Sequence, residues 1–106
     1  MINRLNEHLL DAPSIEGDTC CVCGRVATNH HHVIPKGMGG SKLEKRIPTV
    51  PLCGMGNTSG CHGMAHSGRL FLDYRGGRWM YYEANEPTTL LAAMSDDEGW
   101  WYCDGQ

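Results

Sequence analysis

Apolar side chains at the start of the chain follow a roughly helical period: Ile2, Leu5, Leu9 and Leu10. This period predicts a short amphipathic helix over residues 2–11, on which His8 is an exposed polar residue. The helix should end before Pro13, because the residue in front of a proline disfavours helical backbone.

The middle of the chain changes to extended patterns. Residues 29–35 have β-branched side chains after a run of histidines, which predicts a strand that enters a turn at Pro35. Residues 47–52 are also extended but contain two prolines, so we expect the second arm of a long-looped hairpin and not a central strand. A short helix should follow, capped by Ser59 and containing Cys61, His62 and His66.

The last third of the sequence predicts a hairpin, a helix and an apolar tail. Residues 69–75 and 78–82 flank Gly76-Gly77, a strong signal for a two-residue turn, and the hairpin's aromatic side chains are expected to pack on the preceding segment. Residues 87–95 suit a helix with Pro87 in its first turn. The tail, 99–103, is either a docked edge strand or a surface for a partner, and both alternatives stay open.

Composition indicates that so small a chain needs a bound metal or disulfides in addition to its apolar core. The 106 residues suit one domain, but 14 glycines and a single Phe leave few large apolar side chains for a core. No run approaches the length of a membrane helix, and the first residues lack the apolar core of a signal peptide. We therefore expect a cytoplasmic protein whose six cysteines bind metal; a secreted disulfide fold is the alternative.

The formal charge of −3 hides an uneven distribution. Residues 24–82 contain eight basic and two acidic residues, a balance of +6, whereas residues 83–106 contain six acidic residues and no base. The basic block coincides with the cysteines and histidines, so it favours a local site for a polyanion, although solvated surface charges would give the same excess. The acidic tail either weakens non-specific DNA binding or is simply solvated.

The cysteines indicate a structural metal site. Cys20-x2-Cys23 is typical of a zinc knuckle, whose tight turn lets both sulfurs face one ion at about 2.3 Å. Cys21 competes for the ion, but its one-residue gap makes chelation at one tetrahedral centre awkward. The long loop that connects the other two candidate ligands contains three glycines, which can take positive φ. The sequence therefore predicts Zn²⁺ held by Cys20, Cys23, Cys53 and Cys61, and it leaves Cys103 as a free thiol.

The histidines indicate a second site of different character. His62 and His66 are separated by one helical turn, and with His31 from the strand they provide three nitrogen ligands, which leaves positions open for water and substrate. His32 is surplus to this set and is a natural general base near neutral pH. Basic residues around a glycine-rich loop at 36–41 are candidates for binding DNA: Lys36, Lys42, Lys45, Arg46 and Arg69.

The combined pattern resembles an HNH endonuclease of the ββα-metal fold, and the small phage-encoded, zinc-stapled members are the most similar. The resemblance covers residues 20–66 and rests on Cys20-x2-Cys23, His31-His32-Val33-Ile34-Pro35-x3-Gly39-Gly40, Leu52-Cys53 and Cys61-His62-x3-His66. It implies that His31, His62 and His66 bind one divalent metal (Mg²⁺, Mn²⁺, Ni²⁺ or Zn²⁺) and that His32 is the general base. The distance to Pro35 makes His30 a neighbour and not a member. The family leaves 5′-phosphate and 3′-hydroxyl ends.

The sequence departs from the family at the asparagine that gives the motif its middle letter. Pro48-Thr49 stands where that asparagine is expected, and Asn57 lies in a different loop. In the family the asparagine fixes the loop that orients the base, so its absence bears on rate and geometry more than on the type of reaction. Thr49 is the candidate substitute.

Together these observations predict one α+β domain over residues 1–106, with a ββα-metal core and zinc knuckle at 20–68 and a hairpin extension at 69–106. The expected function is metal-dependent hydrolysis of DNA phosphodiester bonds by a monomer that needs no membrane. The alternative is a non-catalytic zinc module that binds DNA or a phage terminase or packaging protein.

Overall fold

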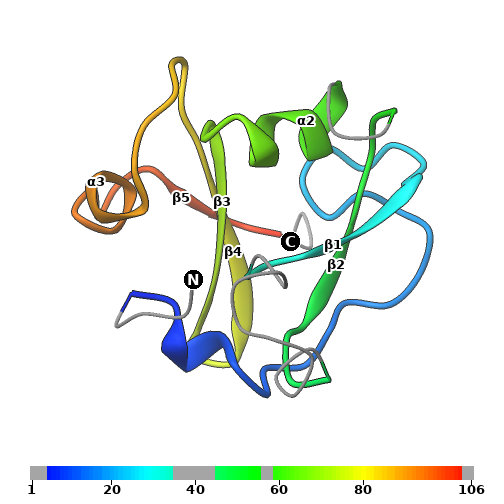
Figure 1. Ribbon diagram of the computed structural model, residues 1–106, viewed down its shortest axis with the longest axis horizontal. Coiled ribbons are helices and arrows are strands. Elements are labelled where there is room, and N and C mark those ends of the chain that lie inside the picture. Colours follow the sequence, from blue (N-terminus) through cyan, green and yellow to red (C-terminus); the bar gives the residue numbers. More distant parts are fainter. Residues whose placement is uncertain (1–4, 35–44, 56–58, 104–106) are drawn as a thin grey trace.

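A computed structural model of the chain describes residues 5–34, 45–55 and 59–103. It is a small mixed α+β fold, as the sequence predicts, with two separate antiparallel sheets (Figure 1). The smaller sheet pairs β1 (Asn29–His32) with β2 (Thr49–Leu52), and the larger sheet has the order β3 (Leu70–Arg75), β4 (Arg78–Glu83), β5 (Trp100–Tyr102). Three short helical elements accompany them: η1 (Glu7–Leu9), α2 (Gly60–His66) and α3 (Leu90–Met94).

The long-looped hairpin is confirmed by the antiparallel pairing of β1 and β2. In this pair His30 lies opposite Pro51 and His32 opposite Thr49. Pro51 is tolerated because this two-stranded sheet does not require its missing amide, and its carbonyl accepts a hydrogen bond from outside the pair. The first strand is shorter than the predicted 29–35, since it ends at His32 and Pro35 lies outside the described residues.

The segment that carries the first cysteines runs along the outer edge of β2. The amide of Ile15 donates to the carbonyl of Thr49 at 2.9 Å, and the amide of Cys21 donates to the carbonyl of Pro51 at 3.0 Å. A further bridge joins Thr19 to Val26 and closes the turn between them. These bonds fix the predicted zinc knuckle against the strand that leads to Cys53.

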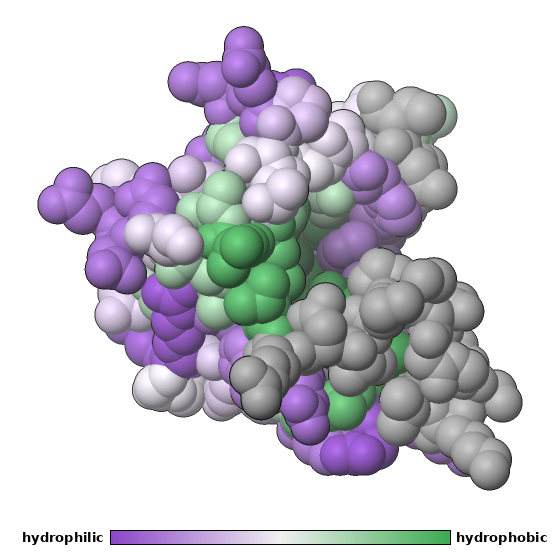
Figure 2. Space-filling model, turned by 60° about the vertical axis from the view of Figure 1, so that its left-hand side comes forward, coloured by the Kyte–Doolittle hydropathy of each residue, from purple (hydrophilic) through white to green (hydrophobic). Residues whose placement is uncertain are grey.

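The second predicted hairpin is also confirmed. Its turn residues Gly76 and Gly77 have φ of 58° and 83°, the left-handed backbone that a tight two-residue turn requires. The apolar tail forms β5, an edge strand that pairs with β4, so the docked alternative is correct. Trp101 nevertheless remains 65% exposed. On the side of the molecule that carries α3, a hydrophobic area lies next to hydrophilic residues (Figure 2).

The predicted helix at 2–11 is wrong over the residues that the structure describes. Only a single 3-10 turn, η1, forms there, and Asp11 adopts a φ of 68° that ends any helical path. Leu9 is buried against the core, and the amide of Asp11 donates to the carbonyl of Arg46, so tertiary contacts prevail over the weak helical period. His8 is exposed as expected, but it also pairs with Asp73 at 2.5 Å.

The predicted helix at 87–95 forms over a shorter range. Thr89 is its N-cap, and its hydroxyl accepts from the amide of Ala92 at 3.1 Å, so Pro87 lies before the helix and not in its first turn. Within the described ranges, no helix has both the length and the apolar character that crossing a membrane needs.

Side chains from both sheets meet in one apolar core with five of the six cysteines. Helix α2 packs against β2 and β3 and so joins the two sheets (Figure 1). The indole of Trp79 donates to the carbonyl of Pro13 at 2.7 Å, which holds the N-terminal segment on the hairpin. The core consists of Leu9, Cys20, Cys21, Ile34, Ile47, Val50, Leu52, Cys53, Cys61, Leu70, Leu72, Trp79 and Cys103.

Candidate metal centres

Two groups of metal-binding side chains come together in the described part of the chain. In each group the candidate ligand atoms all lie within 4.8 Å of one another. The first group is Cys20, Cys23, Cys53 and Cys61, and the second is His31, His62 and His66. These are the two ligand sets that the sequence predicts, although their members come from segments far apart in the chain.

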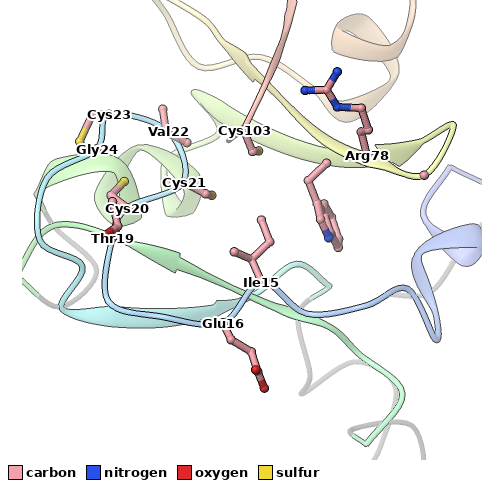
Figure 3. A pocket seen from close by; sticks show the side chains of 12 residues that line it. Ile15, Glu16, Thr19, Cys20, Cys21, Val22, Cys23, Gly24, Arg78 and Cys103 are labelled. Atoms are coloured by element: carbon pink, nitrogen blue, oxygen red, sulfur yellow. The ribbon is translucent and has the colours of Figure 1, made fainter. Parts of the chain in front are cut away.

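The knuckle presents the first two cysteines on one side of a tight turn. The amide of Gly24 donates to the carbonyl of Cys20 at 3.1 Å, and Gly24 has a φ of 81°, which closes the turn. The side chains of Cys20 and Cys23 lie on the same side of it, whereas Cys21 points away from them (Figure 3). Cys21 accordingly does not belong to the four-sulfur group.

Two glycines bring the other two cysteines together. Gly54 and Gly60 have φ of 120° and 63°, and a Cβ on Gly54 would lie 1.9 Å from the carbonyl oxygen of Ser59. The close approach of these backbones closes the loop between Cys53 and Cys61, as the glycine content predicts. The third glycine of that loop, Gly56, lies outside the described residues.

The side-chain cap predicted for the helix after this loop is wrong. Ser59 does stand at the N-cap position of α2, but no side-chain capping bond forms. Its hydroxyl instead accepts from the amide of Met55 at 2.8 Å, back within the cysteine loop. Ser59 therefore stabilises the loop that carries the ligands and not the first turn of the helix.

The sulfur positions fit a zinc ion. The Sγ atoms of Cys23 and Cys53 are 3.5 Å apart, close to the roughly 3.8 Å expected of two thiolates on one tetrahedral Zn²⁺. Burial opposes ionisation of Cys20, but hydrogen bonds from the backbone of Cys23, Val22 and Cys53 outweigh it and lower the pKa of Cys20 to about 7. Burial, followed by the charge of Cys20, raises the pKa of Cys61. Four thiols gathered in this way suit a cation that allows all of them to ionise.

The histidine group forms where β1 meets α2. The ring centroid of His31 lies 5.2 Å from that of His62 and 5.3 Å from that of His66. The predicted i, i+4 spacing places both helical imidazoles on one face of α2, and their Nε2 atoms are 3.1 Å apart. Two nitrogens bound to one metal at about 2.0–2.1 Å would be separated by roughly 3 Å, so these positions fit a shared ion.

The electrostatics of His31 and His66 favour neutral imidazoles. Burial, followed by the neighbouring His62, His66 and His32, lowers the pKa of His31 to about 4. Burial and His62 also lower the pKa of His66. His31 is therefore neutral at physiological pH and its nitrogen lone pair is available to a cation. Unlike the cysteines, the group supplies only three ligands, so a bound ion would keep positions for water or substrate.

His32 lies beside this group but outside it. Because successive side chains of a strand point to opposite faces, His31 faces α2 while His30 and His32 face the other side of the small sheet. His30 is exposed and His32 is half-buried. His32 is the last residue of β1, and its partner across the sheet is Thr49.

The predicted DNA-binding residues are distributed unevenly. Lys45 and Arg46 are exposed, and Arg46 makes a two-pronged contact with Asp11, with its Nη2 at 2.6 Å from Oδ2. This pair is largely exposed, so it binds the guanidinium weakly. Arg69 is half-buried and donates to the carbonyl of Ala84 at 3.4 Å. Lys36 and Lys42, with the glycine-rich loop at 36–41, lie outside the described residues.

Two relationships between side chains were not predicted. Asp73 is only 2% exposed and lies between His8 and Arg75, whose Nε is 2.5 Å from its carboxylate. Cys21, which the sequence leaves as an alternative zinc ligand, and Cys103, which it leaves as a free thiol, line one cavity. Neither could be predicted, because each joins distant segments and has no characteristic spacing.

A scan against models of protein families, a search of curated proteins and a search of solved structures each returned no match. Functional inference therefore depends on the two groups of candidate metal ligands. The cysteine group can provide a complete tetrahedral shell, which suits a structural ion such as zinc. The histidine group has three candidate ligands, and His32, the next residue of β1 after His31, is not one of them.

Proposed function

We propose that this chain is a metal-dependent DNA endonuclease of the HNH type, in which β1, β2 and α2 form a ββα-metal core. One observation carries the proposal: His31 contacts both His62 and His66, while His32, the next residue, lies outside that group. Three ligands and a separate imidazole are the parts that hydrolysis of a phosphodiester needs.

The two groups have separate tasks in this proposal. The four cysteines hold a structural Zn²⁺ that joins the knuckle to the loop before α2, which a chain with so small a core requires. The three histidines hold the catalytic cation. A divalent ion there supplies Lewis-acid stabilisation of the phosphate and of the leaving 3′-oxygen.

His32 acts as the general base. It accepts a proton from the attacking water, and its position at the end of β1 lets a phosphate that lies across the strand end meet both His31 and His32. His32 directly follows His31, a member of the ligand group, in β1. Thr49, opposite His32, limits the rotation of the base.

Basic residues that precede β2 bind the DNA backbone in this proposal. Lys45 and Arg46 follow the glycine-rich loop and are exposed, and Arg46 can exchange the carboxylate of Asp11 for a phosphate because that ion pair is solvated. Such contacts carry no sequence information, so we expect binding that weakens steeply as the salt concentration rises.

Nicking of supercoiled plasmid tests the proposal against its rival. The zinc-loaded protein should convert supercoiled to open-circular DNA with at least one of Mg²⁺, Mn²⁺, Ni²⁺ or added Zn²⁺, and His62→Ala, with its cysteines intact, should be inactive in the same preparation. A non-catalytic zinc module would instead shift DNA in a gel and cleave it with none of these ions. That outcome would exclude the nuclease.

A further inference from the structure

Two cysteines outside the metal-binding groups face the same cavity. Cys21 belongs to the knuckle, and its amide donates a hydrogen bond to the carbonyl of Pro51 at 3.0 Å. Cys103 follows β5, and its amide donates to the carbonyl of Trp79 at 3.0 Å. The side chains are 6% and 4% exposed. Figure 3 shows that both extend into the space between the knuckle and the hairpin.

The cavity gives a small molecule access to this pair. Its volume is about 700 Å³, within the range of sites that accept small ligands. The walls include Ile15, Val22 and Trp79, and the exposed residues Glu16, Gly77 and Arg78 also line it. The guanidinium of Arg78 lies 3.6 Å from the ring centroid of Tyr102, and its side chain points away from Cys21 and Cys103 (Figure 3).

The two thiols lie next to each other and have no other task in the proposed mechanism. The Cys21 side chain is in hydrogen-bonding contact with the Cys103 thiol. A metal-bound cysteine would be an ionised ligand, but Cys21 points away from the sulfurs of Cys20 and Cys23 (Figure 3).

We propose that Cys21 and Cys103 are a site of reversible oxidation, at which a low-molecular-weight disulfide such as glutathione disulfide converts the two thiols into one intramolecular disulfide. The disulfide joins the knuckle to the end of β5, two segments 82 positions apart in the chain.

The reaction balances as two thiol–disulfide exchanges. One cysteine, as its thiolate, attacks a sulfur of glutathione disulfide, which forms a mixed disulfide and releases one glutathione thiolate. The other cysteine then attacks the protein sulfur of the mixed disulfide and releases the second glutathione. The protein loses two electrons and two protons, and the two protons end on the two glutathione thiols.

Peptide mapping tests the proposal directly. The zinc-loaded protein is incubated with glutathione disulfide, its remaining thiols are alkylated under denaturing conditions with a chelator, and it is cleaved with trypsin. Cys103 is the only cysteine of the tryptic peptide 79–106, and Cys21 lies in peptide 5–25. We expect one cross-link between these peptides, assigned to Cys21 by fragmentation, and its loss on reduction with dithiothreitol.

Two variants separate this disulfide from random oxidation. Cys21→Ser and Cys103→Ser should each abolish the cross-link and leave the bound zinc unchanged. In the wild type the disulfide should raise Tm, because it closes a long loop in the unfolded chain. The proposal is overturned if Cys103 stays alkylated or carries only glutathione, or if it is joined to a zinc-ligand cysteine. It is also overturned if Cys21→Ser retains the same cross-link.

Discussion

His32 and Thr49 are direct partners across the small sheet, and their side chains lie on the same face of it. The amide and carbonyl of Thr49 are bonded outward, to the hydroxyl of Ser14 and the amide of Ile15, each at 2.9 Å. The pair is therefore of the non-hydrogen-bonded kind, in which Cα atoms approach to about 4.5 Å and side chains are closest. Thr49 is therefore positioned to restrict the rotation of the His32 side chain, the proposed base.

Thr49 is accordingly expected to act as a positioning residue. Thr49→Val, which keeps the branched shape but removes the hydroxyl, should lower kcat for plasmid nicking by roughly tenfold while KM changes little. Thr49→Ser should restore most of the rate. If Thr49→Val lowers Tm and activity together, or if serine fails to rescue it, the residue has only a structural role.

The cysteine and histidine groups should bind metal independently. After dialysis the wild type should retain about one zinc per chain, and Cys53→Ser should lose it and unfold at a lower temperature, because structural zinc contributes directly to folding. Cys103→Ser makes the same chemical change outside the group and should keep the zinc. His66→Ala should also keep it, and should lose only the binding of an added Mn²⁺ or Ni²⁺. Zinc retained by Cys53→Ser would contradict the four-cysteine site.

The close approach of the backbones at Gly54 and Ser59, before α2, can be tested by alanine substitution of two glycines with positive φ. Gly24→Ala meets no atom within 4 Å and should cost only the left-handed backbone strain, about 1 kcal/mol. Gly54→Ala places a Cβ against the carbonyl of Ser59 and should cost roughly 3 kcal/mol or more. Urea unfolding of the zinc-loaded variants measures both. Equal losses would mean that close approach of the two backbones is not required.

Acid should weaken the fold through the histidine group. The pKa of His31 in the folded chain is about 4, below its ordinary value of 6.5, so the unfolded chain binds the proton more readily. The contribution of neutral His31 to the free energy of unfolding is complete above pH 6.5 and is lost as the pH falls toward 4. At pH 5 the loss is up to roughly 2 kcal/mol. With one equivalent of zinc and no other metal, Tm of the wild type should fall more between pH 7.5 and 5 than Tm of His31→Gln. Parallel curves would contradict this.

The sequence predicts those parts of the molecule that depend on local spacing. The turn at Gly76-Gly77 and the pairing of residues 47–52 with the histidine strand are correct, because turn chemistry and proline placement act within a few residues. The ligand groups were also predicted, since a tight knuckle and an i, i+4 histidine pair have few geometric alternatives.

The errors arise where distant contacts decide the local structure. A helical period around Leu9 is not sufficient when the backbone of Asp11 bonds to Arg46 and turns away. Ser59 stands at the predicted N-cap position, but its hydroxyl accepts a hydrogen bond from the amide of Met55 and not from an amide of α2, because the folded loop brings Met55 to it. The proximity of Cys21 to Cys103 depends on how β5 docks, which no spacing along the chain reports.

Comparison of His32→Ala with His30→Ala tests the central claim most directly. The two histidines are two positions apart on the same face of the strand, but only His32 stands at the strand end beside the ligand group. With the cation that supports nicking by the wild type, His32→Ala should lower the rate about 100-fold or more, as loss of a general base does, and His30→Ala should change it by no more than a few-fold. Full activity in His32→Ala would contradict the account.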